Sequence, residues 1–339
     1  MLKSGSDQAS VAIVVPVYNE AEVLPEFWRR LEAVMQASTG FRFHAIFVDD
    51  GSRDRSFAIL QEIAARDARV SAIRFSRNFG KEAAMTAGID YADADWTVII
   101  DADLQDPPEL IPEMLRRAGD GYDVVLAHRT SRHGESWHKQ FFSHLFYRLM
   151  GILNPGFDLP TDTGDYRLMS RRAIAALARL RESNRFMKGI FAWIGFPTSK
   201  VSYERDPRYS GTSKFDFLKL LNHAIDGITS FSTMPLRIAT YLGLLVSLLA
   251  FAYGIAVVIR TALYGDPVAG FPTLIASILF LGGVQLLCIG IIGEYVGRIY
   301  GEAKQRPLYL IEGIAGTHAQ IKNDPPQRSR EAQAPVDTK

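Results

Sequence analysis

The chain has 339 residues, which is enough to bury the core of one large domain or two ordinary ones. Its 38 Lys and Arg residues nearly balance its 37 Asp and Glu residues, so the formal net charge is only +1. This balance gives no overall attraction for nucleic acid, and we expect no nucleic-acid partner. The single cysteine, Cys288, excludes an intramolecular disulfide and a multi-cysteine metal site, and its apolar neighbours indicate a packing role.

The N-terminal residues 1–9 are polar and lack the apolar run of a signal peptide, so we expect the domain that follows to stay in the cytoplasm. Short apolar runs then predict five strands, at residues 11–17, 43–48, 70–75, 97–100 and 123–127. Helical patterns separate them, at residues 22–35, 55–66, 81–91 and 108–117. This alternation predicts an α/β fold with a doubly wound, mostly parallel, Rossmann-like sheet.

Polar residues follow three of these strands, and ligands of such sheets bind beyond the carboxyl ends of the strands. Neither a G-x-G-x-x-G nor a P-loop motif is found in the sequence, so glycine cradles do not explain phosphate binding. The sequence Asp101-Ala102-Asp103 instead offers two carboxylates for Mg²⁺ or Mn²⁺, which binds few carboxylates and completes its shell with water and phosphate. Acidic residues at strand ends also cap helices, and that interpretation stays open.

The segment from Arg129 to Leu153 carries several cations and an amphipathic apolar pattern. It either lies in the membrane interface with its basic side toward lipid phosphates or packs as an ordinary core helix with solvated charges. Its three histidines lack the spacing of a zinc site.

Two later motifs carry charge on short loops. Asp162 and Asp165 flank a Thr-Gly pair, where they either face the substrate or cap a following helix. Arg208, Ser213 and Lys214 lie on a Gly-containing loop that either closes over a diphosphate or contacts the membrane surface.

Two charge-free runs, residues 238–259 and 271–293, are each long enough to cross a bilayer as a helix. Basic residues lie outside the pair, at Arg237 and at Arg298, Lys304 and Arg306, so the positive-inside rule places both flanks in the cytoplasm. The alternative is a pair of buried core helices. Residues 317–339 are polar and Pro-rich, which predicts a disordered tail.

Four sequence blocks together resemble the family-2 glycosyltransferases of the GT-A fold: VAIVVPVYNEAEVL, FVDDGSRDRS, RNFGKEAAMTAG and VIIDADLQDPPELIPEM. More narrowly, the chain is similar to the polyprenyl-phosphate glycosyltransferases, which include bactoprenol glucosyltransferases and dolichol-phosphate mannose synthases. The resemblance covers about residues 10–312, including TDTGDYRLMSRR, RYSGTSKF and the two-span hairpin.

The resemblance implies inverting transfer of a sugar from a nucleotide sugar to a polyprenyl phosphate at the cytoplasmic face of the inner membrane. UDP-glucose and undecaprenyl phosphate are the expected substrates; GDP-mannose or a UDP-N-acetylhexosamine are alternative donors. A non-catalytic scaffold and a processive polysaccharide synthase are further alternatives. The synthase would show a Q-x-x-R-W motif, which the sequence lacks.

The resemblance also assigns roles to single residues. Those expected to bind the nucleotide sugar are Pro16, Tyr18, Asn19, Glu20, Asp49, Asp50, Lys81, Asp101 and Gln105. The expected metal ligands are Asp101, Asp103 and Gln105, and the expected catalytic residues are Asp103, Asp165 and Asp162. The acceptor phosphate is expected at Arg129, Lys139, Ser143, Arg208 and Lys214.

These expectations give a layout along the chain. After the N-terminal tail comes a glycosyltransferase domain at residues 10–213, followed by an amphipathic interface helix at 214–235. A transmembrane hairpin at 236–298 and a juxtamembrane segment at 299–316 complete the layout before the tail. By resemblance the protein forms a homo-oligomer, a tetramer, and works with a flippase and a downstream glycosyltransferase.

The chemistry of the expected acceptor explains why the site needs positively charged groups more than it needs a general base. A phosphate monoester with a second pKa near ~6 is largely deprotonated at pH 7 and attacks without surrendering a proton. The site then needs positive charge to position the acceptor and a metal to stabilise the leaving diphosphate.

Overall fold

The structure is a computed structural model that describes residues 8–130, 163–183, 185–204, 229, 232–264 and 270–316. The chain forms two compact units. The first contains the sheet, including the strand that follows residue 307, and the second contains the two long C-terminal helices.

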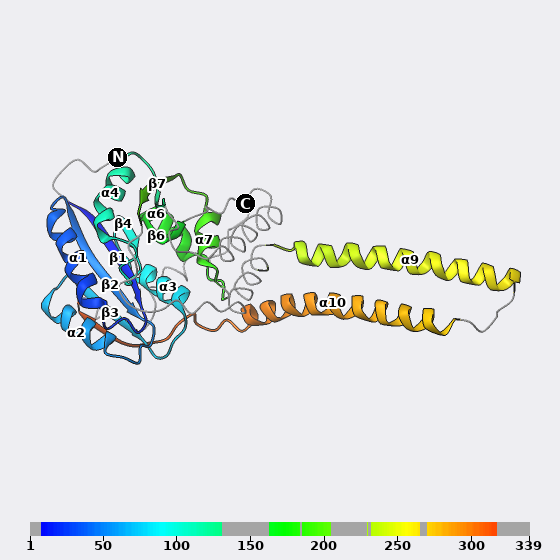
Figure 1. Cartoon of the computed structure of the whole chain (residues 1–339). Helices are drawn as coiled ribbons and strands as arrows, with labels where there is room; N and C mark the ends of the chain where they lie inside the picture. The colour runs from blue at the N-terminus through cyan, green and yellow to red at the C-terminus, as the bar shows by residue number, and fades with distance from the viewer. Residues whose placement is uncertain are drawn as a thin grey trace, which may run out of the picture. The chain divides into compact units, whose positions relative to one another are not determined.

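The first unit is built on one eight-stranded sheet in the order β7-β5-β6-β4-β1-β2-β3-β8. Figure 1 labels β7, β6, β4, β1, β2 and β3 in this order across the sheet. Its strands are β1 (Ala9–Val17), β2 (Phe41–Asp49), β3 (Val70–Phe75), β4 (Trp96–Ile99), β5 (Val124–Arg129), β6 (Thr163–Ser170), β7 (Thr198–Tyr203) and β8 (Ile311–Gly316). The central strands β4, β1, β2 and β3 run parallel, whereas β6 and β8 pair antiparallel with β4 and β3. The predicted doubly wound, mostly parallel sheet is confirmed, in a mixed form.

Helices cover both faces of this sheet. They are α1 (Leu24–Ala37), α2 (Ser56–Arg66), α3 (Lys81–Tyr91), α4 (Ile111–Gly119), α6 (Arg171–Ala178) and α7 (Met187–Trp193), with a short 3₁₀ turn, η1 (Pro108–Leu110). One core cluster joins α1, α2 and α4 to one face of the strands, while α3 crosses the other face. Both faces of the central strands are therefore buried, which explains why those strands read as continuous apolar runs.

Helix α3 lies close to the sheet because Gly88 faces β1. A Cβ atom at Gly88 would come within 2.1 Å of Cγ1 of Val14. Val14 pairs with Ile99, so β1 and β4 end side by side, and Lys81 at the start of α3 borders the same pocket as Val17 and Asp101. The fold thus gathers the ends of β1, β4 and α3 at one edge.

The predicted elements of the first 130 residues all occur, with ends shifted by a few residues. The Asp162–Asp165 region differs from expectation: Thr163–Ser170 is a strand, β6, and the cap of the next helix is Ser170, whose Oγ accepts from the N–H of Ala173 at 3.3 Å. Asp165 therefore caps no helix. The expected juxtamembrane segment also contributes β8 to the sheet.

The second unit contains α9 (Met234–Tyr264) and α10 (Phe271–Ala303). Their apolar windows, Met234–Ala256 and Phe280–Ala303, have mean hydropathies of 2.0 and 1.6 and almost no buried residues. A core helix of a soluble protein would bury such a window, and a signal sequence would lie near the N-terminus. Both helices are long and apolar enough to span a membrane, and each extends beyond the run predicted from the sequence. The expected interface helix at 214–235 lies almost entirely outside the described residues.

Candidate active site

A pocket of about 410 Å³ opens at the carboxyl ends of β1 and β4, beside the start of α3. Of the residues predicted to bind the nucleotide sugar, Pro16, Tyr18, Glu20, Asp50, Lys81 and Asp101 line it, and so does Asp103, which was predicted as a metal ligand and catalytic residue. Asn78 and Gly80 line it as well; they belong to the RNFGKEAAMTAG block, but the sequence analysis gave them no role. The fold therefore brings residues from four separate sequence blocks to one pocket.

The loop after β1 is fixed to the loop after β2. Asn19 adopts a left-handed backbone with φ of 55°, which asparagine tolerates better than most residues. Its N–H donates to Ser52 Oγ at 2.9 Å, and its Oδ1 accepts from the N–H of Arg53 at 2.9 Å. Asn19 thus shapes the loop, while its neighbour Tyr18 is 41% exposed at the pocket.

The two aspartates after β2 have different surroundings. Asp50 accepts hydrogen bonds from the N–H groups of Phe79 at 2.6 Å and Gly80 at 2.9 Å, and so fixes the loop that precedes α3. Asp49 is fully buried, accepts from the N–H of Ser52 at 3.3 Å, and is not among the residues that line the pocket. Burial raises the pKa of both carboxyls.

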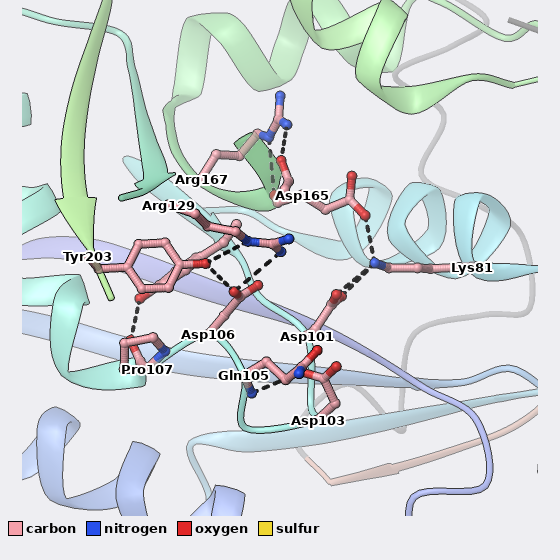
Figure 2. Close-up of polar contacts among 12 residues, drawn as sticks. Lys81, Asp101, Asp103, Gln105, Asp106, Pro107, Arg129, Asp165, Arg167 and Tyr203 are labelled. Carbon is pink, nitrogen blue, oxygen red and sulfur yellow. Dashed lines mark hydrogen bonds and ion pairs between the residues drawn. The ribbon is translucent and has the colours of Figure 1, made fainter. Parts of the chain in front are cut away.

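Lys81 connects two carboxylates that arise far apart in the sequence. Its Nζ donates to Asp101 at 2.8 Å and to Asp165 at 2.6 Å, and Figure 2 shows the ammonium between them. Burial acts to raise the pKa of Asp165, but Lys81 outweighs it and lowers that pKa to about 2. For Asp101, burial prevails and raises the pKa. The antiparallel pairing of β6 with β4 is what places Asp165 near the end of β4.

Asp103 and Gln105 lie on the turn after β4. Oδ1 of Asp103 accepts from the N–H of Gln105 at 3.1 Å, and Leu104 between them has a positive φ of 60°. This turn holds the Asp103 carboxylate at the pocket, whereas the side chain of Gln105 is buried, with 7% exposed, and is not among the lining residues.

A divalent cation fits the chemistry of this pocket. Oδ1 of Asp101 is buried and lies 2.8 Å from Nζ of Lys81, and the Asp103 carboxylate borders the same pocket. Within the described residues no group of three or more His, Cys, Asp or Glu side chains could hold a metal. A cation such as Mg²⁺ takes one or two carboxylates and fills its shell with water and substrate oxygens, so two aspartates suffice.

Arg129 belongs to a second cluster of polar and charged side chains, which lies beside the pocket. Its Nη2 lies 3.6 Å from Oδ1 of Asp106, and its Nε donates to the hydroxyl oxygen of Tyr203 at 3.2 Å. That hydroxyl donates a short hydrogen bond to Asp106 (Figure 2). Gly164 leaves room for the guanidinium, because a Cβ there would come within 2.6 Å of Nη2. Asp106, to which the sequence analysis gave no role, is thus the counter-ion of Arg129.

The sequence analysis missed three charged residues on the α3 side of β6. Arg167 donates to the carbonyl oxygens of Gly164 at 2.8 Å and Asp165 at 3.1 Å. Its Cζ lies 3.6 Å from the centroid of the Phe191 ring. Burial raises the pKa of Glu82 to about 7, and burial lowers the pKa of Lys188, although Asp165 opposes the latter shift. Arg167 and Glu82 could have been noticed, since they lie within the TDTGDYRLMSRR and RNFGKEAAMTAG blocks; Lys188 lies in no quoted motif.

The remaining predicted site residues lie outside the described part of the chain. They are Asp162, Lys139, Ser143, Arg208 and Lys214. Their roles stay predictions.

Comparisons with known proteins identify the family of the chain. Residues 12–177 match the family Glycosyl transferase family 2, and residues 234–299 match the GtrB C-terminal hairpin. The chain is 45% identical over 90% of its length to an uncharacterized glycosyltransferase of Synechocystis, covering 96% of that protein. It is 44% identical over 89% of its length to the bactoprenol glucosyl transferase of Shigella phage SfV, covering 98% of it. It is 43% identical over 90% of its length to a prophage bactoprenol glucosyl transferase homolog of Escherichia coli, covering 99% of it.

These relatives span nearly the whole chain, so their similarity includes both the pocket-bearing sheet and the hairpin. The chain therefore belongs to glycosyl transferase family 2 and is a glycosyltransferase that carries a GtrB-type C-terminal hairpin.

Proposed function

We propose that the chain transfers glucose, with inversion, from UDP-glucose to undecaprenyl phosphate at the cytoplasmic face of the inner membrane. The observation that carries the proposal is the pocket in which Lys81, Asp101 and Asp103 meet, on a chain that also has two exposed apolar helices. The relatives named bactoprenol glucosyl transferases support the choice of sugar and lipid.

On the donor side, we assign the nucleotide to the wall formed by the loops after β1 and β2, and the diphosphate to the end of β4. Tyr18 offers an exposed ring at the pocket, and Asp50 keeps the loop before α3 in place. A divalent cation held by Asp101 and Asp103 would stabilise negative charge on the departing diphosphate. Lys81, already bound to Asp101, is within reach of the same charge.

On the acceptor side, Arg129 supplies a fixed positive charge whose orientation Asp106 and Tyr203 maintain. The acceptor phosphate is already ionised at neutral pH, so the site needs no strong base. Asp165 stays ionised, because Lys81 lowers its pKa to about 2, and we assign it to the sugar, where a carboxylate stabilises positive charge at the anomeric carbon.

The hairpin gives the membrane attachment. With α9 and α10 as the two spans, the basic residues Arg237, Arg298, Lys304 and Arg306 lie at the outer ends, which favours a cytoplasmic location for both flanks and both termini. The tetramer, the flippase and the downstream glycosyltransferase remain predictions from the family resemblance.

The test is transfer by the detergent-solubilised full-length protein. We expect radiolabel from UDP-glucose to enter the organic phase with undecaprenyl phosphate, and EDTA to stop the reaction. Parallel reactions with GDP-mannose and UDP-N-acetylglucosamine identify the donor. The absence of a lipid-extractable product with any donor would overturn the transferase proposal and favour a scaffold. A long water-soluble polymer would indicate a processive synthase.

A further inference from the structure

The segment that follows α10 and contains β8 lies outside both family matches, which end at residues 177 and 299. It nevertheless completes the sheet. Strand β8 pairs antiparallel with β3, with Ile314 opposite Ile73, and the N–H of Ser76 donates to the carbonyl oxygen of Leu310 at 3.0 Å. Tyr309, next to this bond, is only 8% exposed.

The ring of Tyr309 begins an aromatic stack that leads to the pocket wall. It stacks on Phe75 with centroids 5.1 Å apart and planes inclined by 10°. Phe75 in turn meets Phe79 edge to face, with centroids 5.7 Å apart. Phe79 precedes Gly80 and Lys81, which line the pocket. The stack therefore contacts the 76–80 loop through Phe79, while the Asp50 carboxylate accepts from the N–H groups of Phe79 and Gly80.

The hydroxyl of Tyr309 reaches the other end of the same helix. It donates to Oδ2 of Asp90, near the C-terminal end of α3, at 2.7 Å. Arg181 binds both oxygens of Asp90, at 2.8 and 2.6 Å. One side chain thus supports α3 at its C-terminal end directly and, through two phenylalanines, the loop that enters its N-terminal end.

We propose that Tyr309 is a positioning residue for donor binding: its ring holds the 76–80 loop so that Asn78, Gly80 and Lys81 form the wall of the donor pocket. The ring carries this role, because Asp90 keeps its bidentate bond to Arg181 when the hydroxyl is removed. The inference rests on the proposed function for the identity of the donor, but the order of the loop is independent of it.

The first experiment measures hydrogen–deuterium exchange of the ligand-free full-length protein in detergent. Aromatic pairs contribute enough that Tyr309→Leu should speed exchange of the Phe79 and Gly80 amides by about 3- to 10-fold. Tyr309→Phe keeps the ring and should exchange at the parent rate. The matched control is Leu310→Ala, which removes a neighbouring side chain that is 53% exposed and leaves the backbone bond to Ser76.

The second experiment measures transfer kinetics with UDP-glucose. Tyr309→Leu should raise the KM for the donor by about 3- to 10-fold with little change in kcat, and Tyr309→Phe should restore the parent KM. If Tyr309→Leu does not fold, Phe79→Leu breaks the same stack from the loop side and should give the same pair of changes.

Parent-like exchange in both leucine variants would overturn the positioning role, and so would an equal effect of Leu310→Ala or a failure of Tyr309→Phe to restore the parent behaviour. If the parent protein does not use UDP-glucose, the proposed donor is wrong, and the exchange comparison alone decides the role of Tyr309.

Discussion

The two units of the chain place apolar side chains in opposite ways. In the first unit, the large apolar side chains among the described residues are mostly buried, and the exposed ones are Tyr18, Tyr122, Trp193 and Leu310. In the hairpin, exposed leucines, isoleucines and aromatics run along both helices. The first unit instead buries charge, at Asp49, Asp50, Asp106 and Arg167. The difference indicates two solvents, water around a polar pocket and lipid around the hairpin.

The largest effect is expected when a carboxylate is removed from the pocket. Asp103→Ala should lower metal-dependent transfer at least about 100-fold, because the leaving diphosphate loses its charge stabilisation. The protein should stay folded and membrane-bound, since the Asp103 side chain is only partly buried and is not part of the apolar core. Lipid-extractable product and membrane fractionation measure the two outcomes. Glu62→Ala, at an exposed carboxylate on α2, is the control and should keep full activity. Full activity of the Asp103 variant would refute the assignment.

The next prediction compares the same substitution, to arginine, at two equally exposed positions, one in each unit. Leu249 in the hairpin and Trp193 in the first unit are both 61% exposed. Leu249→Arg should cost about 2.5 to 3.5 kcal/mol of membrane insertion, because the guanidinium would lie in hydrocarbon. Trp193→Arg should cost nothing in insertion. Carbonate extraction of membranes compares the two variants, and equal extraction of both would mean that the hairpin does not face lipid.

A third, smaller effect concerns a carboxyl buried beside the pocket. The pKa of Glu82 is raised from 4.5 to about 7 by burial, so the folded chain keeps this proton where the unfolded chain has released it. Stability from Glu82 is therefore present below about pH 4.5 and is lost as the pH rises to about 7. Glu82→Gln, which can still accept from the N–H of Met187, should gain about 1 to 2 kcal/mol at pH 8 after allowance for solvent screening.

Thermal melts of the parent and the Gln variant at pH 5 and pH 8 measure this change. The gain should shrink at the lower pH, where the parent carboxyl is protonated in the folded state. An equal gain at both pH values would show that another property of the amide is responsible.

The smallest expected effect is a change in the KM for the acceptor without a change in the KM for the donor. Gly164→Ala should push the Arg129 guanidinium away from Asp106, since the new Cβ would lie 2.6 Å from Nη2. We expect the KM for undecaprenyl phosphate to rise a few-fold, because the end of an arginine side chain can shift, while the KM for the donor stays unchanged. Initial-rate kinetics with each substrate varied in turn test this. An equal change in both KM values would contradict the assignment of Arg129 to the acceptor.

Much of the first half of the fold could be predicted from sequence, because each parallel strand is buried on both faces and appears as an apolar run between helical patterns. The ends of those runs also located Asp101, Asp103 and Asp50, since parallel strands end at one edge. The partner of Asp101 could not be predicted in this way. Asp165 reaches it through the antiparallel pairing of β6 with β4, which has no local signal.

Strand β8 escaped prediction for a related reason. Its sequence, IEGIAG, is short and contains two glycines, which favour strands poorly, and it follows a span that ends the apolar pattern. The raised pKa of Glu82 and the bond from Lys81 to Asp165 likewise depend on contacts between elements distant in sequence. Patterns along the chain identify which residues carry chemistry, whereas pairing across the sheet determines which of them meet.

The position of β8 also bears on how the protein is made. Ribosomes deliver the chain from its N-terminus, so β1 to β7 and the pocket loops emerge before the hairpin, and β8 emerges after it. Until then β3 is an open sheet edge with unpaired backbone groups, which invites pairing with other chains. The edge is closed only when the ribosome has passed the second apolar helix. Completion of the catalytic sheet is thereby timed to follow synthesis of the membrane anchor.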